Sequence, residues 1–297
     1  MILPDFKYMP VSSVEEACAL LKSCADKGQN ARIYAGGTDL INFIKTGAIK
    51  PDVLVDIKGI PGLDGISYDP AEGLTIGALT KLRDIELSPV VKQYYPAIAE
   101  SVHLIASTQI RSKGTMTGNI CNASPSADSV PALFVLDAQL VIRGSEGERI
   151  VPINNFYCGF KKTVLAADEV VIAIKVPPMK ADESACYLAH TVRKAMDLAI
   201  VGVAVKLTLG ENDVCTDARI ALGAVAVNCV RARTAEAYII GKKVTSEVAA
   251  EAGVMAMADC QPISDVRASA EYRHDMVRVF TKRAVLEALN RSKEVNA

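Results

Sequence analysis

Hydrophobic residues recur at helical spacing in several stretches of the chain, separated by short β-favouring runs. The first helical stretch follows Ser12-Ser13-Val14-Glu15-Glu16, which has the order of a capping box, and it ends at Gly28. A β-favouring run at 31–35 leads into Gly36-Gly37-Thr38-Asp39 and then into a second helical pattern that Gly47 ends. This order predicts a helix, a strand, a tight turn and a second helix.

Short strands and helices alternate irregularly in the next part of the chain. Runs rich in β-favouring residues, bounded by turn residues, predict strands at 53–57, 74–78, 139–143 and 170–176. Apolar residues at helical spacing predict helices at 80–87, 96–106 and 130–136. The irregular alternation favours an α+β architecture.

A second unit is predicted after 177–184. Two prolines and a polar cluster there interrupt both the helical and the strand periodicity of the hydrophobic residues, which indicates a linker. Three strand-like runs then precede the helices, at 185–192, 198–209 and 218–227. Helical patterns follow at 232–240 and 248–259. In the final helix one face forms a core-facing apolar stripe of Met276, Val277, Phe280, Ala284 and Ala288. The order indicates a three-stranded antiparallel sheet covered by helices.

Composition and charge narrow the class of protein. The 297 residues are 50% hydrophobic and 23% charged, as in ordinary globular proteins, and a net charge of -1 gives no field that would favour nucleic acid. Eight scattered cysteines and three distant histidines lack metal-ligand spacing. The longest apolar run, 198–205, is far short of the ~20 residues that span a bilayer. No export signal is evident, so we expect a cytoplasmic location and reduced thiols.

Two glycine-containing segments are candidate binding sites. At Gly36-Gly37-Thr38-Asp39, unpaired backbone N–H groups and a helix dipole could hold an anion such as a pyrophosphate; alternatively, Thr38 or Asp39 caps an ordinary turn. The segment 109–128 has glycines, hydroxyls and asparagines but almost no hydrophobic period, which predicts a loop that presents its backbone, or else a plain surface connection. Neither segment has the ending of a Walker loop or the three-glycine dinucleotide fingerprint.

Taken together, these motifs resemble the FAD-binding (medium) subunit of the molybdenum hydroxylases, the family of xanthine, carbon monoxide and nicotinate dehydrogenases. The resemblance covers nearly the whole chain. The motifs on which it rests in the first unit are Ala35-Gly36-Gly37-Thr38-Asp39-Leu40, Gln109-Ile110-Arg111, Gly114-Thr115-Met116-Thr117-Gly118-Asn119 and Ala123-Ser124-Pro125 with Asp128. In the second unit they are Arg193-Lys194-Ala195-Met196-Asp197-Leu198-Ala199 and Asp265-Val266-Arg267-Ala268-Ser269-Ala270-Glu271-Tyr272-Arg273.

The resemblance implies a two-subdomain FAD-binding fold of the vanillyl-alcohol-oxidase and para-cresol-methylhydroxylase type over 1–176, with subdomains of about 1–58 and 59–176. A C-terminal flavoprotein domain would cover 177–297. FAD would lie extended between the subdomains. The implied cofactor-binding residues are Ile33, Tyr34, Ala35, Gly36, Gly37, Thr38, Asp39, Leu40, Ile105, Thr115, Gly118, Asn119, Asn122, Ser124, Asp128 and Val171. No catalytic acid or base and no metal ligand is expected in this chain.

The function implied is that of the FAD subunit of a larger enzyme. A large partner subunit would hydroxylate the substrate at a molybdopterin cofactor, and a small partner with [2Fe-2S] clusters would pass electrons to FAD. FAD would then reduce NAD(P)+ or another acceptor. Arg193 and Asp197 would lie beside the flavin, where they could shape its electrostatics or form a structural ion pair.

Two other functions remain open. A self-contained FAD oxidoreductase on the same cofactor fold, such as an enolpyruvyl-sugar reductase, would need a substrate-facing acid and serine that the sequence does not display. A non-catalytic assembly protein could hold a nucleotide in the glycine segments without redox turnover.

Three positions depart from the family pattern. Ala189 stands where some relatives carry a lysine near the flavin ring, and Ser112 stands where asparagine is usual. Thr117 replaces a glycine, which would be strained only if the segment required a positive φ there.

Overall fold

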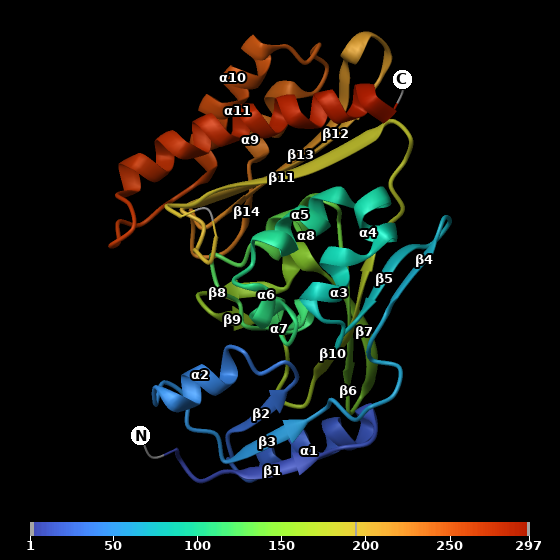
Figure 1. Ribbon diagram of the computed structural model, residues 1–297, viewed down its shortest axis with the longest axis vertical. Helices are drawn as coiled ribbons and strands as arrows, with labels where there is room; N and C mark the ends of the chain where they lie inside the picture. The colour runs from blue at the N-terminus through green and yellow to red at the C-terminus, as the bar shows by residue number, and fades with distance from the viewer. Residues whose placement is uncertain (1–2, 194, 296–297) are drawn as a thin grey trace.

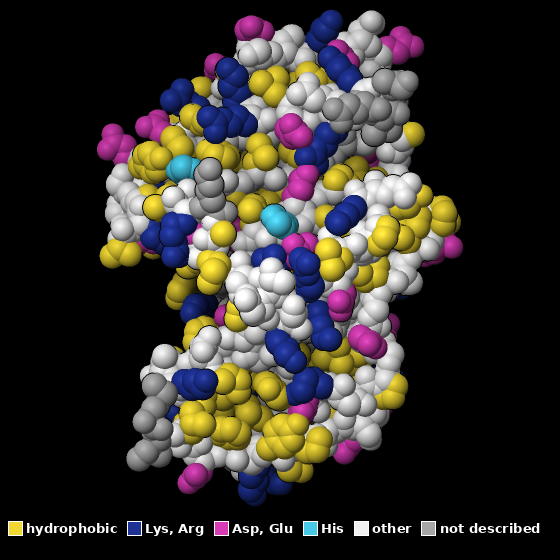
Figure 2. All heavy atoms as spheres, in the orientation of Figure 1, with side chains coloured by type: hydrophobic (Ala, Val, Ile, Leu, Met, Phe, Trp, Pro, Cys, Tyr) yellow, Lys and Arg dark blue, Asp and Glu magenta, His cyan; other side chains and the backbone are white. Residues whose placement is uncertain are grey.

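Three sheets follow one another along the long axis of the molecule (Figure 1). The structure is a computed structural model and describes residues 3–193 and 195–295. The mixture of parallel sheet, antiparallel sheets and helices confirms the predicted α+β class. On the face shown in Figure 2, basic and acidic side chains are interspersed, in keeping with the net charge of -1.

The N-terminal sheet is parallel, in the order β1-β3-β2. Its strands and helices are β1 (Lys7–Pro10), α1 (Val14–Asp26), β2 (Ala31–Tyr34), α2 (Leu40–Lys45) and β3 (Val53–Asp56). The predicted capping box starts α1: Ser13 Oγ accepts from Glu16 N at 3.1 Å, and Glu16 Oε2 accepts from Ser12 N at 2.7 Å. Leu21 and Ala17 of α1 are buried in the core of this sheet.

The middle sheet is antiparallel, in the order β4-β5-β10-β6-β7. Its strands are β4 (Ile66–Asp69), β5 (Gly73–Gly77), β6 (Gln139–Gly144), β7 (Gly147–Pro152) and β10 (Val170–Val176), and a separate hairpin is formed by β8 (Tyr157–Gly159) and β9 (Lys162–Thr163). The helices of this part are α3 (Leu82–Leu87), α4 (Pro89–Tyr94), α5 (Pro96–Leu104), α6 (Thr108–Arg111), α7 (Met116–Cys121) and α8 (Ser129–Val135).

The segment 109–128 is not the continuous loop that its composition predicted, because it contains most of α6 and all of α7. Ser107 Oγ accepts from Ile110 N, and Thr115 Oγ1 accepts from Gly118 N, so a hydroxyl caps each helix. Met116, one of the two large apolar side chains of α7, is fully buried. Helices of four and six residues are too short to show a hydrophobic period.

The C-terminal sheet is antiparallel, and it has four strands, not the three that were predicted. They are β11 (Glu183–His190), β12 (Val201–Leu209), β13 (Cys215–Gly223) and the two-residue β14 (Val230–Arg231). The helices of this part are α9 (Arg233–Ile239), α10 (Ser246–Ala256) and α11 (Ala270–Val295). The predicted stripe of α11 faces the core, with Val277, Ala284 and Ala288 fully buried.

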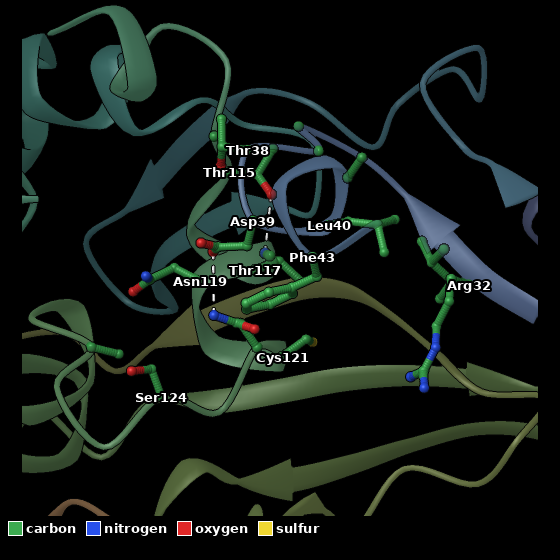
Figure 3. A pocket seen from close by; sticks show the side chains of 18 of the residues that line it. Arg32, Thr38, Asp39, Leu40, Phe43, Thr115, Thr117, Asn119, Cys121 and Ser124 are labelled. Carbon is green, nitrogen blue, oxygen red and sulfur yellow. Dashed lines mark hydrogen bonds between the residues drawn. The ribbon is translucent and has the colours of Figure 1, made fainter. Parts of the chain in front are cut away.

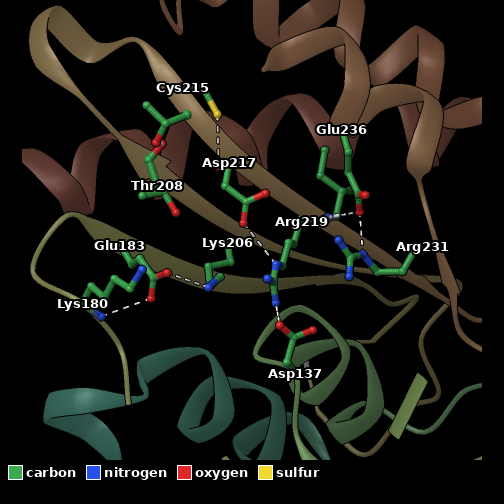
Figure 4. Close-up of polar contacts among 12 residues, drawn as sticks. Asp137, Lys180, Glu183, Lys206, Thr208, Cys215, Asp217, Arg219, Arg231 and Glu236 are labelled. Carbon is green, nitrogen blue, oxygen red and sulfur yellow. Dashed lines mark hydrogen bonds and ion pairs between the residues drawn. The ribbon is translucent and has the colours of Figure 1, made fainter. Parts of the chain in front are cut away.

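Helices α5 and α8 separate the C-terminal sheet from the middle sheet, while α11 covers its outer face (Figure 1). Arg219 of β13 forms an ion pair with Asp137, directly after α8, and so joins the two parts (Figure 4). Lys206 of β12 is buried against Glu183 of β11, at 2.9 Å from its carboxylate. None of the helices in the described residues is long and apolar enough to span a bilayer.

Candidate cofactor-binding site

One cavity of about 910 Å³ lies where the N-terminal sheet, the α6–α7 segment and the loop between β11 and β12 approach one another. This volume is near the upper end of the ~300–1,000 Å³ that is usual for small-molecule and cofactor sites. All but one of the sequence-predicted cofactor positions line it. These are Ile33, Ala35, Gly36, Gly37, Thr38, Asp39, Leu40, Ile105, Thr115, Gly118, Asn119, Asn122, Ser124, Asp128 and Val171.

Tyr34 is the exception, because its side chain packs behind the turn. A Cβ on Gly37 would lie 2.2 Å from Cε2 of the Tyr34 ring, and Lys58 Nζ sits 3.4 Å from the ring centroid. Gly37 has a φ of +70°, which glycine adopts without strain. The turn therefore needs glycine at this position for its own packing, whether or not a ligand is bound.

The two glycine segments contact each other and form one wall of the cavity. A Cβ on Gly36 would lie 2.3 Å from Lys113 O and 2.8 Å from Gly114 Cα. Asn122 Nδ2 donates to Asp39 Oδ2 across the same contact, at 3.3 Å (Figure 3). Two segments that are far apart in the sequence thus present their backbones to the same space.

The β2–α2 turn holds backbone donors that the chain does not use. Within the described residues, no hydrogen bond is made by the N–H groups of Gly36, Gly37, Thr38 or Asp39. Asp39 occupies the N-cap of α2 without accepting a helix N–H, so the alternative of a side-chain cap is not supported there. The free N–H groups at the cavity wall suit an anionic ligand.

The α7 wall adds hydroxyl and amide groups. Thr117 Oγ1 is buried and has no hydrogen-bond partner in the part of the chain that the structure describes. Thr117 lies inside α7, so the strain anticipated for a positive φ does not arise. Ser129 Oγ donates to Asn119 Oδ1 at 2.7 Å, which fixes the Asn119 amide. Figure 3 shows the Asn119 side chain among those that line the cavity.

Two carboxylates line the cavity, the buried Asp128 and the more exposed Asp39, and desolvation raises the pKa of each. The pKa of Asp128 rises to about 6, although a hydrogen bond from Tyr187 opposes the shift. The pKa of Asp39 is raised by burial and lowered in part by the charge of Lys161.

Arg111, part of the Gln109-Ile110-Arg111 motif, supports the site from behind. Its Nε donates to Glu86 Oε2 at 2.8 Å, and its guanidinium also donates to Ile105 O at 2.9 Å. Burial opposes the charge of Glu86, but hydrogen bonds from Arg111, His103 and Arg83 outweigh it and lower the pKa of Glu86 to about 2. The role of Arg111 could not be predicted from the sequence, because its partner Glu86 is 25 residues away.

The loop between β11 and β12 closes the cavity from the C-terminal sheet. Asp197 accepts from Arg193 N at 2.9 Å and from Leu198 N at 3.0 Å, and these hydrogen bonds lower its pKa. Asp197 therefore shapes the loop, and it also forms the predicted ion pair with Arg193, whose Nη2 lies 3.6 Å from Asp197 Oδ1; both residues line the cavity. Lys194 of the same motif lies outside the described residues, and Ala189 is in β11, away from the cavity lining.

Several further lining residues were not among the predicted cofactor-binding positions, although Met196 lies in the 193–199 motif and Cys121 in the 109–128 segment. They include Arg32, Phe43, Cys121, Glu169 and Met196. Phe43 projects from α2 into the space that Cys121 also borders (Figure 3). Among the described residues no cluster of three or more potential ligands could hold a metal ion.

Comparison with known families decides what kind of protein this is. Residues 4–179 match the model of the FAD binding domain in molybdopterin dehydrogenase, and residues 187–288 match that of the CO dehydrogenase flavoprotein C-terminal domain. The chain belongs to the FAD subunits of the molybdenum hydroxylases. The resemblance inferred from the motifs is thereby confirmed.

Relatives of this FAD subunit match over nearly their whole length. The carbon monoxide dehydrogenase medium chain of Hydrogenophaga pseudoflava is 35% identical over 96% of this chain and 97% of its own. A xanthine dehydrogenase FAD-binding subunit of Escherichia coli O157:H7 is 31% identical, over 96% of this chain and 97% of its own. The solved carbon monoxide dehydrogenase of H. pseudoflava superposes with a TM-score of 0.92 at 36% identity, covering 98% of this chain and 99% of that chain.

Membership of this family establishes the general class of the protein and its cofactor. The chain is a flavoprotein component of an oxidoreductase, and FAD is its cofactor. The residues of the cavity fit that cofactor, since unused N–H donors, a buried hydroxyl without a partner and a sufficient volume occur together.

Proposed function

We propose that this subunit is the electron exit of a multi-subunit molybdenum hydroxylase. Electrons would arrive from [2Fe-2S] clusters after substrate hydroxylation at a molybdopterin cofactor, and they would leave to NAD(P)+ or another acceptor. The observation that carries this proposal is the single cavity lined by both glycine segments, with unused N–H donors in the first.

The chain's own residues would bind and orient the cofactor. The N–H groups of Gly36 to Asp39 would hold the pyrophosphate, while Thr115, Gly118 and Asn119 would line the channel toward the flavin. FAD supplies the redox chemistry when bound, and the protein supplies binding, orientation and electrostatics. The assignment of individual residues to parts of FAD belongs to this proposal, as does the division into domains at 1–176 and 177–297.

The partners are proposed from the names of the relatives. "Medium chain" and "FAD-binding subunit" denote components of larger enzymes. We propose a small [2Fe-2S] subunit and a large molybdopterin subunit as the partners of this chain. The substrate would be selected by the large subunit.

Purification of the native protein with its partners tests the proposal. Flavin absorbance together with molybdenum and about four iron atoms per flavin, as two [2Fe-2S] clusters would give, is the expected result. Flavin in a chain that purifies alone, without iron or molybdenum, would favour the self-contained oxidoreductase. A protein without flavin would favour the non-catalytic assembly protein. Rapid mixing of the reduced complex with NAD+, NADP+, ferredoxin and a quinone would then identify the acceptor.

A further inference from the structure

A hydrogen bond joins the C-terminal sheet to the cavity wall. Tyr187, in β11, donates its hydroxyl proton to Asp128 Oδ1 at 2.7 Å, and both side chains are buried. Asp128 lines the cavity, whereas Tyr187 stands behind it. Tyr187 is the only side chain of the described residues that hydrogen-bonds to this carboxylate.

The orientation of Asp128 is not explained by its own helix. Asp128 occupies the N-cap of α8, a position where aspartate usually accepts a helix N–H, but its side chain makes no such bond. The carboxylate is turned toward Tyr187 instead. One carboxylate oxygen therefore has a fixed donor, and the other has acceptor capacity left over.

The C-terminal sheet is built to let the Tyr187 hydroxyl reach this point. Gly202 of β12 has no side chain, and a Cβ there would lie 2.4 Å from the Tyr187 hydroxyl oxygen. Glycine weakens a strand interior and often marks a close approach. The neighbouring Gly223 of β13 pairs with Gly202, and its own Cβ would lie 2.9 Å from Pro131 Cγ of α8. Two adjacent glycines thus admit both the phenol and the helix that carries Asp128.

A hydrogen bond of its backbone N–H also holds Tyr187 in place, and its hydroxyl group remains protonated and can donate a hydrogen bond. Its N–H donates to Glu100 Oε2 at 2.9 Å, and Glu100 forms an ion pair with Arg291 of α11. Burial raises the pKa of Tyr187 well above its ordinary value, so the phenol remains protonated. The hydroxyl proton is consequently always available to Asp128.

From these contacts we infer that Tyr187 is a positioning residue of the FAD site, which holds Asp128 so that its second oxygen accepts from an N–H or O–H donor of the cofactor. The inference rests on the proposed placement of FAD in this cavity. It adds a residue of the C-terminal sheet that does not itself line the site. It also gives a role to the buried carboxylate of Asp128 at the place where the cofactor binds.

The pH dependence of FAD binding distinguishes positioning from a merely structural role. A donor from the cofactor favours the ionised carboxylate, so FAD should bind more weakly as pH falls through about 6, the pKa of Asp128 in the free protein. Tyr187→Phe removes the hydrogen bond that lowers the pKa of Asp128, so that pKa rises. The pH below which FAD binding weakens should therefore be higher in Tyr187→Phe than in the wild type. At neutral pH the Kd for FAD should rise about three- to tenfold, the usual contribution of one hydrogen bond. Other ionisable groups line the same cavity and must be separated from this effect: Arg32, Asp39, Cys121, Glu169, Arg193 and Asp197.

The experiment is a fluorescence titration of the apoprotein with FAD between pH 5 and 8 for a set of variants. Asp128→Asn should abolish the titration near pH 6, and adding Tyr187→Phe to it should have no further effect on the pH profile. Tyr95→Phe is the matched control, because it removes another buried hydroxyl, which donates to Pro177 O at 3.1 Å away from the cavity. If Tyr187→Phe does not fold, Gly202→Ala should shift the profile in the same direction by displacing the phenol.

The outcomes distinguish the role of Tyr187 from the proposed placement of FAD in the cavity. A folded Tyr187→Phe protein with the wild-type Kd and pH profile overturns the role of Tyr187 and leaves the proposed function intact. An effect of Tyr187→Phe that persists unchanged in the Asp128→Asn background also overturns it. Failure of the wild-type apoprotein to bind FAD overturns the proposed placement itself.

Discussion

The contact between the β2–α2 turn and the Lys113–Gly114 backbone can be tested with one methyl group. In Gly36→Ala the new Cβ would lie 2.3 Å from Lys113 O and 2.8 Å from Gly114 Cα, and main-chain atoms cannot rotate away. To reach ordinary contact at 3.4 Å, the two segments must separate by about 1 Å. Overpacking of this kind costs about 1–3 kcal/mol, and the free energy of unfolding of the apoprotein should fall by that amount.

FAD affinity should fall as well, since the unused N–H groups and the α7 wall lie on opposite sides of this contact. If closing the wall around FAD carries a further cost of this size, beyond that already present in the apoprotein, the Kd rises about 5- to 150-fold. Gly47→Ala is the matched control: Gly47 has a φ of +74° and no atom within 4 Å of its Cβ position, so the variant adds backbone strain of about 1 kcal/mol away from the site. Urea unfolding and FAD titration measure both quantities. Wild-type stability and Kd in Gly36→Ala would refute the close contact and its role.

Three further predictions follow from the site and its support. Gly37→Leu should yield apoprotein, because the Leu side chain would collide with the Tyr34 ring and distort the turn; retention of stoichiometric FAD would contradict this. FAD at 100 times its Kd should raise the free energy of unfolding by about 2.7 kcal/mol, and an unchanged melting temperature would count against binding to the folded state. The pKa of Glu86 is lowered from 4.5 to about 2, so its contribution to stability is complete above pH 4.5 and is lost as pH falls toward 2. Glu86→Gln should remove this part of the acid transition in urea unfolding measured across that range, and an unaltered profile would argue against the pair with Arg111.

The strands that the sequence did not predict share a physical property. β1, β4, β7, β14 and the two strands of the β8–β9 hairpin were not predicted, and each is paired on one side only. Every residue of β1 is exposed, and Val151 is the only buried residue of β7. An edge strand is not buried on both sides and so shows a weaker apolar run, which accounts for the strands that were missed. The edge strands β2 and β11 were nevertheless predicted, so an edge position weakens this signal without removing it.

Parts of the site could be predicted from consecutive residues, whereas other parts depend on contacts between residues that are far apart in the sequence. The β2–α2 turn could be predicted because its glycines, hydroxyl and acid are consecutive. The pair of Tyr187 and Asp128 could not, since 59 residues separate them and neither residue is unusual in its own segment. Arg111 was visible in a motif, but its role depends on Glu86, which only the fold brings within 2.8 Å.

The cavity wall also has a consequence for the order of events in folding. Its lining runs from the N-terminal sheet to the β11–β12 loop, so it is complete only after segments as distant as Arg32 and Leu198 have come together. Such long-range closures are slow, and a ligand that needs the finished wall gains nothing from the earlier, partly folded chain. If FAD binds there, we expect it to slow unfolding, so that the folded subunit lasts longer, and to leave the rate of folding unchanged.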